Sequence, residues 1–366
     1  MTSSSDDIVS TNQKRAGMVR LGVIGCGVIG PTHIAGASSN SRAHVVGVAD
    51  LVRAKAEGVA EKFNIPRATT KAMDLVNDPN IDAIVLAMPT SDRFELARAT
   101  LMAGKHLLIE KPAAMNGAEL KQLVPLAKDR VVACASSRFR YSPVGKAFAT
   151  ILKSYPVGKL RLLQVRASVP ASIRTDAPPA WRLNRSLNGG GILVNWGVYD
   201  LDFLVGSLDW SLQPLEVMAA AWPIMPDLSK WVAAGSDAET HVKAMIRFRN
   251  GVVLDYERAE FNSGKPEFVW RMTGDQGTLE VPMLGGDQCC ITLSEVTPDG
   301  LVEHELWRQC GPNPDVHFGP VNDFVDAIVD CRPPLTGLRQ AIALTQLTDM
   351  IYESAETGRA VISNET

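Results

Sequence analysis

The stretch that decides the fold is Gly25-Cys26-Gly27-Val28-Ile29-Gly30, which has the spacing G-x-G-x-x-G. An apolar run at residues 19–24 precedes it, and a helix-like segment around residues 33–38 follows it. A second apolar run, residues 44–50, ends in an acid, Asp50. Six such residues alone are a weak signal, but in this order of strand, turn, helix, strand and acid they predict a dinucleotide-binding turn.

Each position of this turn has a physical reason. Gly25 permits the tight turn, Gly27 has no Cβ and lets the backbone approach a pyrophosphate, and Gly30 lets the helix pack on the strand. Val28 and Ile29 begin the helix, where free N–H groups and the helix dipole favour phosphate. We therefore predict that these five residues bind the cofactor.

The acid selects between the two nicotinamide dinucleotides. Asp50 is placed to accept hydrogen bonds from the adenosine ribose hydroxyls, and its charge would repel a 2′-phosphate. The next residue is Leu51 rather than Arg or Ser. The sequence therefore favours NAD, while Arg53 lies close enough to leave NADP open.

The rest of the first half alternates apolar strands with helical segments. Such alternation predicts a doubly wound parallel sheet with helices on both faces, the Rossmann fold, over residues 18–139. The further strands are expected at residues 81–87, 105–109 and 131–135, and the helices at 54–63, 94–103 and 118–128.

The second half changes character and predicts a second α/β domain over residues 140–366. Its longer strands alternate polar and apolar residues, which is typical of a large, open and mainly antiparallel sheet. Asn250-Gly251 is a strong hairpin signal. Helical periodicity returns between residues 321 and 358, where we expect helices that pack back on the first domain. The strands are expected at residues 160–169, 215–222, 241–248, 252–261, 268–273 and 278–281.

One alternating strand suggests self-association. Val242, Ala244, Ile246 and Phe248 share one side of it. Because a large apolar face is unfavourable in water, this pattern predicts a homo-oligomer assembled through the sheet.

The composition excludes several other classes. The chain has 366 residues with 37 basic and 40 acidic side chains, so no basic excess points to nucleic acid or to a membrane surface. No apolar run is long enough to span a bilayer. Residues 1–17 are polar and are expected to be a disordered leader. The six cysteines lack metal-ligand spacing, so we expect a reducing cytoplasm and no metal.

A segment after the expected strand 105–109 carries a resemblance to a known family. Residues 103–112, Ala-Gly-Lys-His-Leu-Leu-Ile-Glu-Lys-Pro, resemble the glucose–fructose oxidoreductase, inositol dehydrogenase and rhizopine catabolism family, Gfo/Idh/MocA. Further segments are similar to the family at residues 189–191 with Gly197 and Asp202, at 274–280, at 323–324 and at 354–361.

The resemblance implies NAD or NADP as cofactor and sugars, polyols or related carbonyl compounds as substrates. It implies dimers or tetramers joined through the open sheet, so we expect a homodimer or homotetramer. It also places Pro89, Thr90, Glu110 and Lys111 beside the cofactor.

Lys111 is the first catalytic candidate. It follows the carboxyl end of a sheet strand, where ligands of α/β proteins bind. A cation there would stabilise an alkoxide and lower the pKa of a neighbouring acid–base group.

The second catalytic candidate lies on the glycine-led helix. Residues 192, 195, 199 and 202 would share one helical face. The family usually has Asp where Asn195 stands and His where Tyr199 stands. We expect Tyr199 to accept a proton if its pKa is lowered, and Asn195 to orient a substrate hydroxyl.

Weaker candidates surround these two. Trp181 and Arg182 are expected to line the substrate pocket. The sequence allows Arg138 at the junction of the domains, and it suggests that Arg93 is only helix surface and that His33 is structural.

These features predict an enzyme, an oxidoreductase that exchanges hydride between NAD(P) and a sugar, polyol or related carbonyl compound. Two alternatives stay open: an NAD-dependent glycoside hydrolase, and a non-catalytic NAD-binding sensor suggested by Asn195 and Tyr199. Net NADH accumulation would separate the dehydrogenase from the hydrolase.

Overall fold

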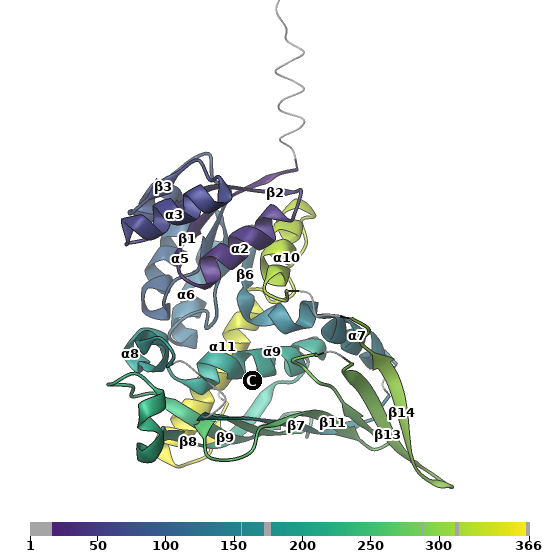
Figure 1. Cartoon of the computed structure of the whole chain (residues 1–366). Helices are drawn as coiled ribbons and strands as arrows, with labels where there is room; N and C mark the ends of the chain where they lie inside the picture. The colour runs from purple at the N-terminus through teal and green to yellow at the C-terminus, as the bar shows by residue number, and fades with distance from the viewer. Residues whose placement is uncertain (1–16, 155, 172–176, 287, 312–314, 364–366) are drawn as a thin grey trace, which may run out of the picture.

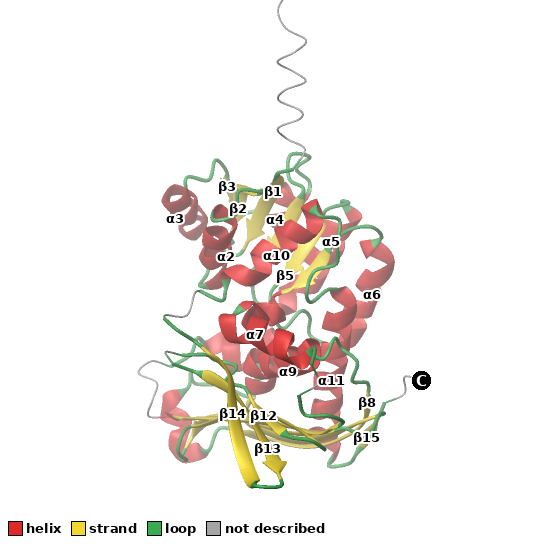
Figure 2. Cartoon of the chain, turned by 90° about the vertical axis from the view of Figure 1, so that its right-hand side faces the viewer, coloured by secondary structure: helices red, strands yellow, loops and turns green. Residues whose placement is uncertain are grey.

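The computed structural model describes residues 17–154, 156–171, 177–286, 288–311 and 315–363. Two sheets form separate layers, and helices α7, α9 and α11 lie between them (Figures 1 and 2). The expected leader, residues 1–17, lies outside the described residues except for Gly17.

The first layer is a six-stranded sheet in the order β3-β2-β1-β4-β5-β6, with neighbouring strands parallel. This is the strand order of the Rossmann fold, and it confirms the predicted fold class. Its strands are β1 (Val19–Ile24), β2 (Ala43–Ala49), β3 (Ala68–Thr69), β4 (Ala83–Leu86), β5 (His106–Ile109) and β6 (Val132–Cys134). The helices that connect them are α2 (Ile29–Ser38), α3 (Arg53–Phe63), α4 (Ala72–Val76), α5 (Arg93–Met102) and α6 (Gly117–Ala127).

Two late helices pack back on the first layer, and the second of them also reaches the other sheet. Helix α10 (Phe318–Val329) packs on α2, where a Cβ at Gly36 would meet Val321 and Phe318. Helix α11 (Leu338–Thr357) begins beside β6 and runs to the second sheet (Figure 1). The domain boundary at residue 139 stays a prediction.

The second layer is a nine-stranded sheet in the order β14-β13-β12-β11-β7-β10-β9-β8-β15. It is open and mostly antiparallel, as predicted, but β10 pairs in parallel with β7. Its strands are β7 (Leu160–Pro170), β8 (Pro214–Pro223), β9 (Glu239–Phe248), β10 (Val253–Asn262), β11 (Glu267–Gly274), β12 (Thr278–Glu280), β13 (Cys290–Thr297), β14 (Gly300–Arg308) and β15 (Val361–Ile362). The helices on its inner side are α7 (Pro143–Leu152), α8 (Arg185–Asn188) and α9 (Val198–Ser207).

The apolar face of the strand that was predicted to join copies of the chain is not available for self-association. Val242, Ala244, Ile246 and Phe248 are buried inside this chain's own core, where α9 and α11 cover the sheet. A single strand cannot reveal this, because alternation shows that one face is apolar but not what covers it.

The sequence analysis also missed the β13–β14 hairpin. Ile291 and Leu293 alternate with polar residues in β13, and Pro298-Asp299-Gly300 lies at the turn. This combination of alternation and turn residues is a hairpin signal that was available in the sequence.

Candidate functional site

The glycine turn is shaped by contacts that a side chain would break. Gly25 has φ +104°, and a Cβ there would lie 2.5 Å from Ala87 O. A Cβ on Gly30 would lie 1.9 Å from Gly25 O, whereas one on Gly27 would meet nothing within 4 Å. The turn therefore leaves open space at the one glycine where a pyrophosphate must approach.

Asp50 lies beside this turn, at the end of β2. Its Oδ2 accepts a hydrogen bond of 2.8 Å from Cys26 N–H, and its Oδ1 accepts one of 2.9 Å from Val52 N–H. Each carboxylate oxygen keeps capacity for a further donor. Val28 and Leu51 are both 90% exposed, so the space around this carboxylate and the helix start is accessible.

The ends of β4 and β5 carry the other expected cofactor residues. Pro89 precedes a short 3₁₀ turn, and buried Thr90 donates a 3.1 Å hydrogen bond to Asn188 Oδ1. Thr90 therefore ties the first sheet to the segment that leads into the three glycines.

Glu110 is a fixed negative charge at the end of β5. It lies 2.9 Å from His33 Nε2 and accepts a 2.9 Å hydrogen bond from Lys111 N–H. Burial raises the pKa of Glu110, but the hydrogen bond from His33 and the nearby cations outweigh burial and lower it to about 2. His33 thus has the structural role that the sequence suggested.

Arg93 is not helix surface, which corrects the sequence-based expectation. It is 4% exposed and donates hydrogen bonds to Met88 O, at 2.7 Å, and to Glu110 O, at 2.7 Å, as well as to Pro112 O. Arg93 begins α5, and this position puts its guanidinium next to the segments that follow β4 and β5. Burial lowers the pKa of Arg93 to about 10, which leaves it charged at neutral pH.

Lys111 and Asn195 are brought together, although 84 residues separate them. Lys111 Nζ donates to Asn195 O at 2.9 Å and to Asn195 Oδ1 at 3.0 Å. Burial lowers the pKa of Lys111 to about 7; Glu110 opposes this shift, and the charges of Arg138, Arg182 and Arg93 add to it.

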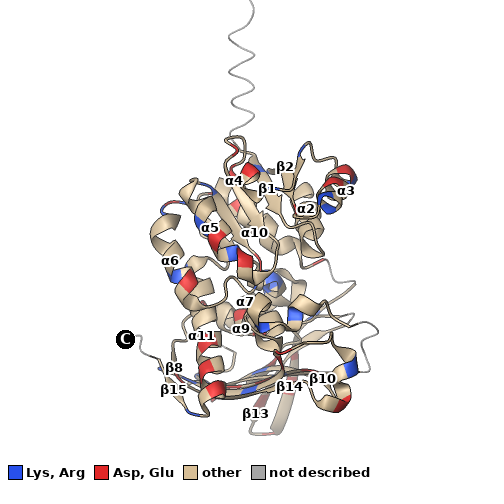
Figure 3. Cartoon of the chain, turned by 90° about the vertical axis from the view of Figure 1, so that its left-hand side faces the viewer, with Lys and Arg blue, Asp and Glu red and all other residues tan. Residues whose placement is uncertain are grey.

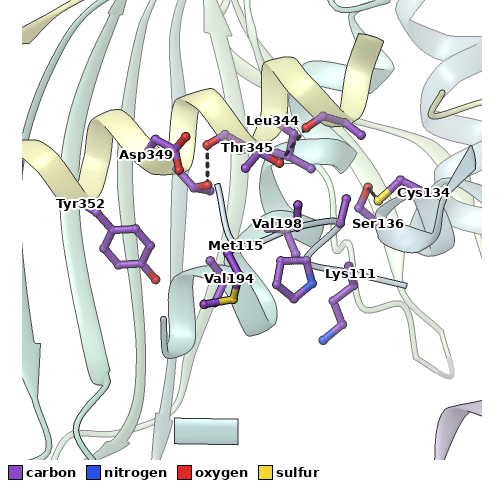
Figure 4. Close-up of a pocket in the computed structure, with 15 residues that line it drawn as sticks. Lys111, Met115, Cys134, Ser136, Val194, Val198, Leu344, Thr345, Asp349 and Tyr352 are labelled. Atoms are coloured by element: carbon purple, nitrogen blue, oxygen red, sulfur yellow. Dashed lines mark hydrogen bonds between the residues drawn. The ribbon is translucent and has the colours of Figure 1, made fainter. Parts of the chain in front are cut away.

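The amine of Lys111 points away from α11 (Figure 4). Behind the lysine is a cavity of about 10 Å³, lined among others by Met115, Ser136 and Tyr352. This volume is close to the minimum for one water molecule. The reactive end of Lys111 therefore faces away from this cavity.

The segment that carries Asn195 is not one regular α-helix. Residues Leu193–Gly197 form a π-helical turn that continues as α9. This changes the expected spacing, and Asp202 instead accepts hydrogen bonds from Ser136 Oγ, at 2.5 Å, and Thr336 Oγ1, at 2.9 Å. π-Helical turns are frequent at functional sites.

A buried carboxylate caps the start of this segment. Glu239 accepts hydrogen bonds from Gly191 N–H at 2.8 Å, Leu193 N–H at 3.1 Å and the Tyr352 hydroxyl at 2.8 Å. A Cβ on Gly190 would lie 1.9 Å from the Tyr352 hydroxyl, so the glycines permit this close packing. The sequence analysis missed Glu239 and Tyr352, because nothing in a single sequence links them to residue 191.

Tyr199 lies between cations and aromatic rings. Lys111 Nζ is 5.0 Å and Arg138 Cζ is 4.0 Å from its ring centroid. Phe139 and Trp196 meet the same ring edge-on. Burial raises the pKa of Tyr199 well above its usual value, with Arg138 opposing the rise. The expected lowering of this pKa is therefore wrong, because the side chain is fully enclosed.

Trp181 and Arg182 lie on a short 3₁₀ turn before the glycines. Trp181 is 39% exposed, while Arg182 is buried and its Nη2 lies 2.5 Å from Glu260 Oε2. Their expected role in substrate binding stays a prediction.

The residues present fit a nicotinamide dinucleotide. The open cradle at Gly27, the helix start at Ile29 and the carboxylate of Asp50 lie at the carboxyl ends of β1 and β2. Lys111 stands beyond the end of β5, which places it on the same edge of the parallel sheet.

Both layers match known family models. Residues 19–137 match the oxidoreductase family with an NAD-binding Rossmann fold, and residues 146–280 match the GFO/IDH/MocA C-terminal domain. The chain belongs to the Gfo/Idh/MocA family and is an NAD-binding oxidoreductase.

Particular relatives are dehydrogenases of levoglucosan and of myo-inositol. The chain is 25% identical to levoglucosan dehydrogenase of Pseudarthrobacter phenanthrenivorans over 60% of each chain. It is 25% identical to myo-inositol 2-dehydrogenase of Thermotoga maritima over 66% of this chain and 69% of the relative. Levoglucosan dehydrogenase solved with NADH and levoglucosan shares the fold, with TM-score 0.80 and 22% identity over 95% of this chain and 100% of that one.

The described residues contain neither a candidate membrane-spanning helix nor a candidate metal-binding group. Among the described residues, no helix combines the length and apolar character needed to cross a bilayer. The same part of the chain contains no group of three His, Cys, Asp or Glu residues arranged to hold a metal ion. That no metal takes part stays an expectation.

Proposed function

We propose that the chain is a dehydrogenase or reductase of sugars or polyols, in which Lys111 carries the proton. The observation that supports this is a partly buried lysine with a pKa lowered to about 7, held by two oxygens of Asn195. A group with a pKa near neutrality is best suited to exchange protons at neutral pH.

The geometry gives each residue a role. Bound NAD supplies the hydride acceptor, or the hydride donor when it is reduced. A neutral Lys111 amine donates its two N–H bonds to Asn195, which leaves its lone pair for a substrate hydroxyl proton. After taking that proton, the ammonium ion keeps its third N–H directed at the substrate oxygen and stabilises negative charge there.

The surrounding residues hold this amine in place. Asn195 orients Nζ, Glu110 fixes the backbone N–H of Lys111, and Arg93 ties the carbonyls on both sides of it. Tyr199 forms the wall beside the amine in this proposal. Its role as the proton acceptor, expected from the sequence, is less favourable because ionising a buried phenol is costly.

The test is a sugar and polyol screen with NAD, read as NADH absorbance, followed by the variants Lys111→Met and Tyr199→Phe. Lys111→Met should bind NAD nearly as the parent does and lose at least about a hundredfold in kcat. Tyr199→Phe should keep most of its activity. If Tyr199→Phe loses all activity while Lys111→Met stays active, Tyr199 carries the proton and Lys111 does not.

The pH profile is a second readout of the same proposal. Because oxidation needs the neutral amine, its rate should rise as the pH increases through about 7. Bond cleavage of glycosides without net NADH would instead favour the hydrolase. Bound cofactor without turnover of any compound would favour the sensor.

The proposal also includes a cytoplasmic homodimer or homotetramer joined through the outer face of the second sheet. Met218 and Met245 lie opposite one another there and are 44% and 58% exposed, and Trp222 on the same strand as Met218 is 47% exposed. The six cysteines are unpaired, which suits a reducing compartment. Light scattering that shows only monomers at micromolar concentration would contradict the oligomer.

A further inference from the structure

The guanidinium of Arg138 lies beside Lys111 and has no hydrogen-bond acceptor among the residues that the structure describes. Arg138 stacks on three aromatic rings, with its Cζ 4.0 Å from the Tyr199 centroid, 4.9 Å from that of Phe139 and 5.6 Å from that of Trp196. Its Nε is buried and has no hydrogen-bond partner among the described residues. Stacking occupies the faces of a guanidinium and leaves its in-plane N–H edge available.

Each of the other arginines near the site has at least one carboxylate or carbonyl partner, although the Nε of Arg258 is also without an acceptor among the described residues. Arg258 pairs with Asp200 at 3.0 Å, and Arg182 pairs with Glu260 at 2.5 Å. Arg93 donates to backbone carbonyls. Within the described part of the chain, only Arg138 in this group has neither a carboxylate nor a carbonyl as partner.

The acids near Arg138 are already engaged. Glu110 is held by His33 and by the backbone of Lys111. Asp315, the acid on the side of α10, accepts hydrogen bonds from the backbone and ring of His317 at 3.0 and 2.7 Å. Asn195, the partner of Lys111, carries no charge. Asp315 therefore attracts the Arg138 guanidinium only through space, and neither Asp315 nor Glu110 accepts a hydrogen bond from it among the described residues.

Arg138 is also in the right place for a substrate. It follows β6, whose carboxyl end neighbours that of β5, and it shares the Tyr199 ring with Lys111. Figure 3 shows basic positions gathered at the level of α7 and α9, between the two sheets. A buried donor without an acceptor is unfavourable, so its presence at a reactive centre indicates a missing ligand.

We propose that the substrate is an anionic sugar or polyol, bearing a carboxylate or a phosphate ester, and that Arg138 binds this anion while Lys111 acts on a hydroxyl. A guanidinium edge matches either group, because both offer two oxygens at the spacing of its fork. This inference rests on the proposed dehydrogenase function and narrows its substrate class.

The test compares matched sets of compounds in the gluco, galacto and manno series: the neutral hexose, the hexuronate, the hexonate and the hexose 6-phosphate. Each is assayed with NAD for NADH formation and for equilibrium binding to the protein–NADH complex by calorimetry. At least one anion should exceed its neutral counterpart in affinity by about tenfold to a hundredfold, the range of a charge-assisted hydrogen bond. The comparison of acids with phosphates identifies the group.

Three variants separate recognition from structure. Arg138→Gln should abolish the preference by raising KM for the anion to that of the neutral hexose. Because Arg138 also helps to lower the pKa of Lys111, any change in kcat should be shared by both compounds. Arg138→Lys should restore part of the preference, because it keeps the charge without the fork. Arg98→Gln, on the exposed side of α5, is the matched control and should change nothing. Added salt should weaken binding of the anionic sugar and leave binding of the neutral hexose unchanged.

The outcomes distinguish the two proposals. If no anion binds more tightly than its neutral counterpart, or if Arg138→Gln weakens both equally, the inference is wrong and Arg138 only packs on the rings. Turnover of neutral sugars alone would leave the dehydrogenase proposal intact. Anion binding lost in Arg138→Gln without turnover of any compound would retain the anion site and reject the dehydrogenase.

Discussion

The cofactor turn and the site around Lys111 are built from different parts of the chain. The turn uses one continuous segment, residues 25–50, and offers mainly backbone groups and a single carboxylate. The site around Lys111 uses side chains from β5, α9 and the segment after β6, and its charges are tuned by burial. A change in the first region should therefore act on binding or folding, and a change in the second on proton transfer.

The largest effect is expected where the turn touches itself. Gly30→Ala would place a Cβ 1.9 Å from Gly25 O, so the backbone must move. We expect a loss of about 1–3 kcal/mol in the free energy of unfolding, the usual cost of overpacking, together with loss of NAD binding. Thermal unfolding and calorimetry would measure the two.

Gly27→Ala is the matched control, because its Cβ would meet nothing within 4 Å. It should leave the free energy of unfolding within about 0.5 kcal/mol of the parent and still weaken NAD, since the methyl group occupies the space of the pyrophosphate. Equal destabilisation by both substitutions would show that the open space at Gly27 is not a ligand site.

A smaller effect is expected at Asp50, which selects the cofactor and contributes one hydrogen bond to the turn. Asp50→Ala should weaken NAD and reduce the discrimination against NADP, because the charge that repels a 2′-phosphate is removed. Titrating both reduced cofactors by fluorescence measures this. Unchanged affinity for both would leave Asp50 with only its bonds to the N–H groups of Cys26 and Val52.

The same difference explains what the sequence could predict. The Rossmann order, the glycine turn and the pairing of β9 with β10 follow from local patterns, since strand, turn and helix signals are contiguous. Arg93 was misjudged because a position at a helix start does not reveal which strand ends pack above it. Glu239 was missed as a site residue for a related reason, because its partners are distant in sequence. Arg138 was expected only at the junction of the domains, since its contact with Tyr199 is equally distant in sequence.

The direction of a pKa shift is harder still to predict, because it depends on how far the folded chain buries the side chain. The sequence suggested that Lys111 would lower the pKa of Tyr199. In the structure Tyr199 is buried and Lys111 is partly buried, and burial acts oppositely on an acid and a base: it raises the pKa of Tyr199 and lowers that of Lys111. Proximity alone therefore gave the wrong proton carrier.

The smallest change, a single oxygen for nitrogen, tests this tuning directly. Asn195→Asp would replace the amide oxygen 3.0 Å from Lys111 Nζ by a carboxylate of almost the same shape. An opposite charge at that distance favours the ammonium form and should raise the pKa of Lys111 by about 1–3 units. Since oxidation needs the neutral amine, its rate at pH 7 should fall, while its rate at pH values above the raised pKa of Lys111 should approach that of the parent.

Reduction should respond in the opposite sense, because it begins from the ammonium ion, which the carboxylate preserves to higher pH. Asn195→Ala controls for lost orientation: it should lower the rate at every pH without moving the basic limb upward. If the basic limb of the pH profile lies at the same pH in Asn195→Asp as in the parent, the group that titrates is not Lys111. The site would then need a different proton carrier, whereas the cofactor turn would be untouched by that result.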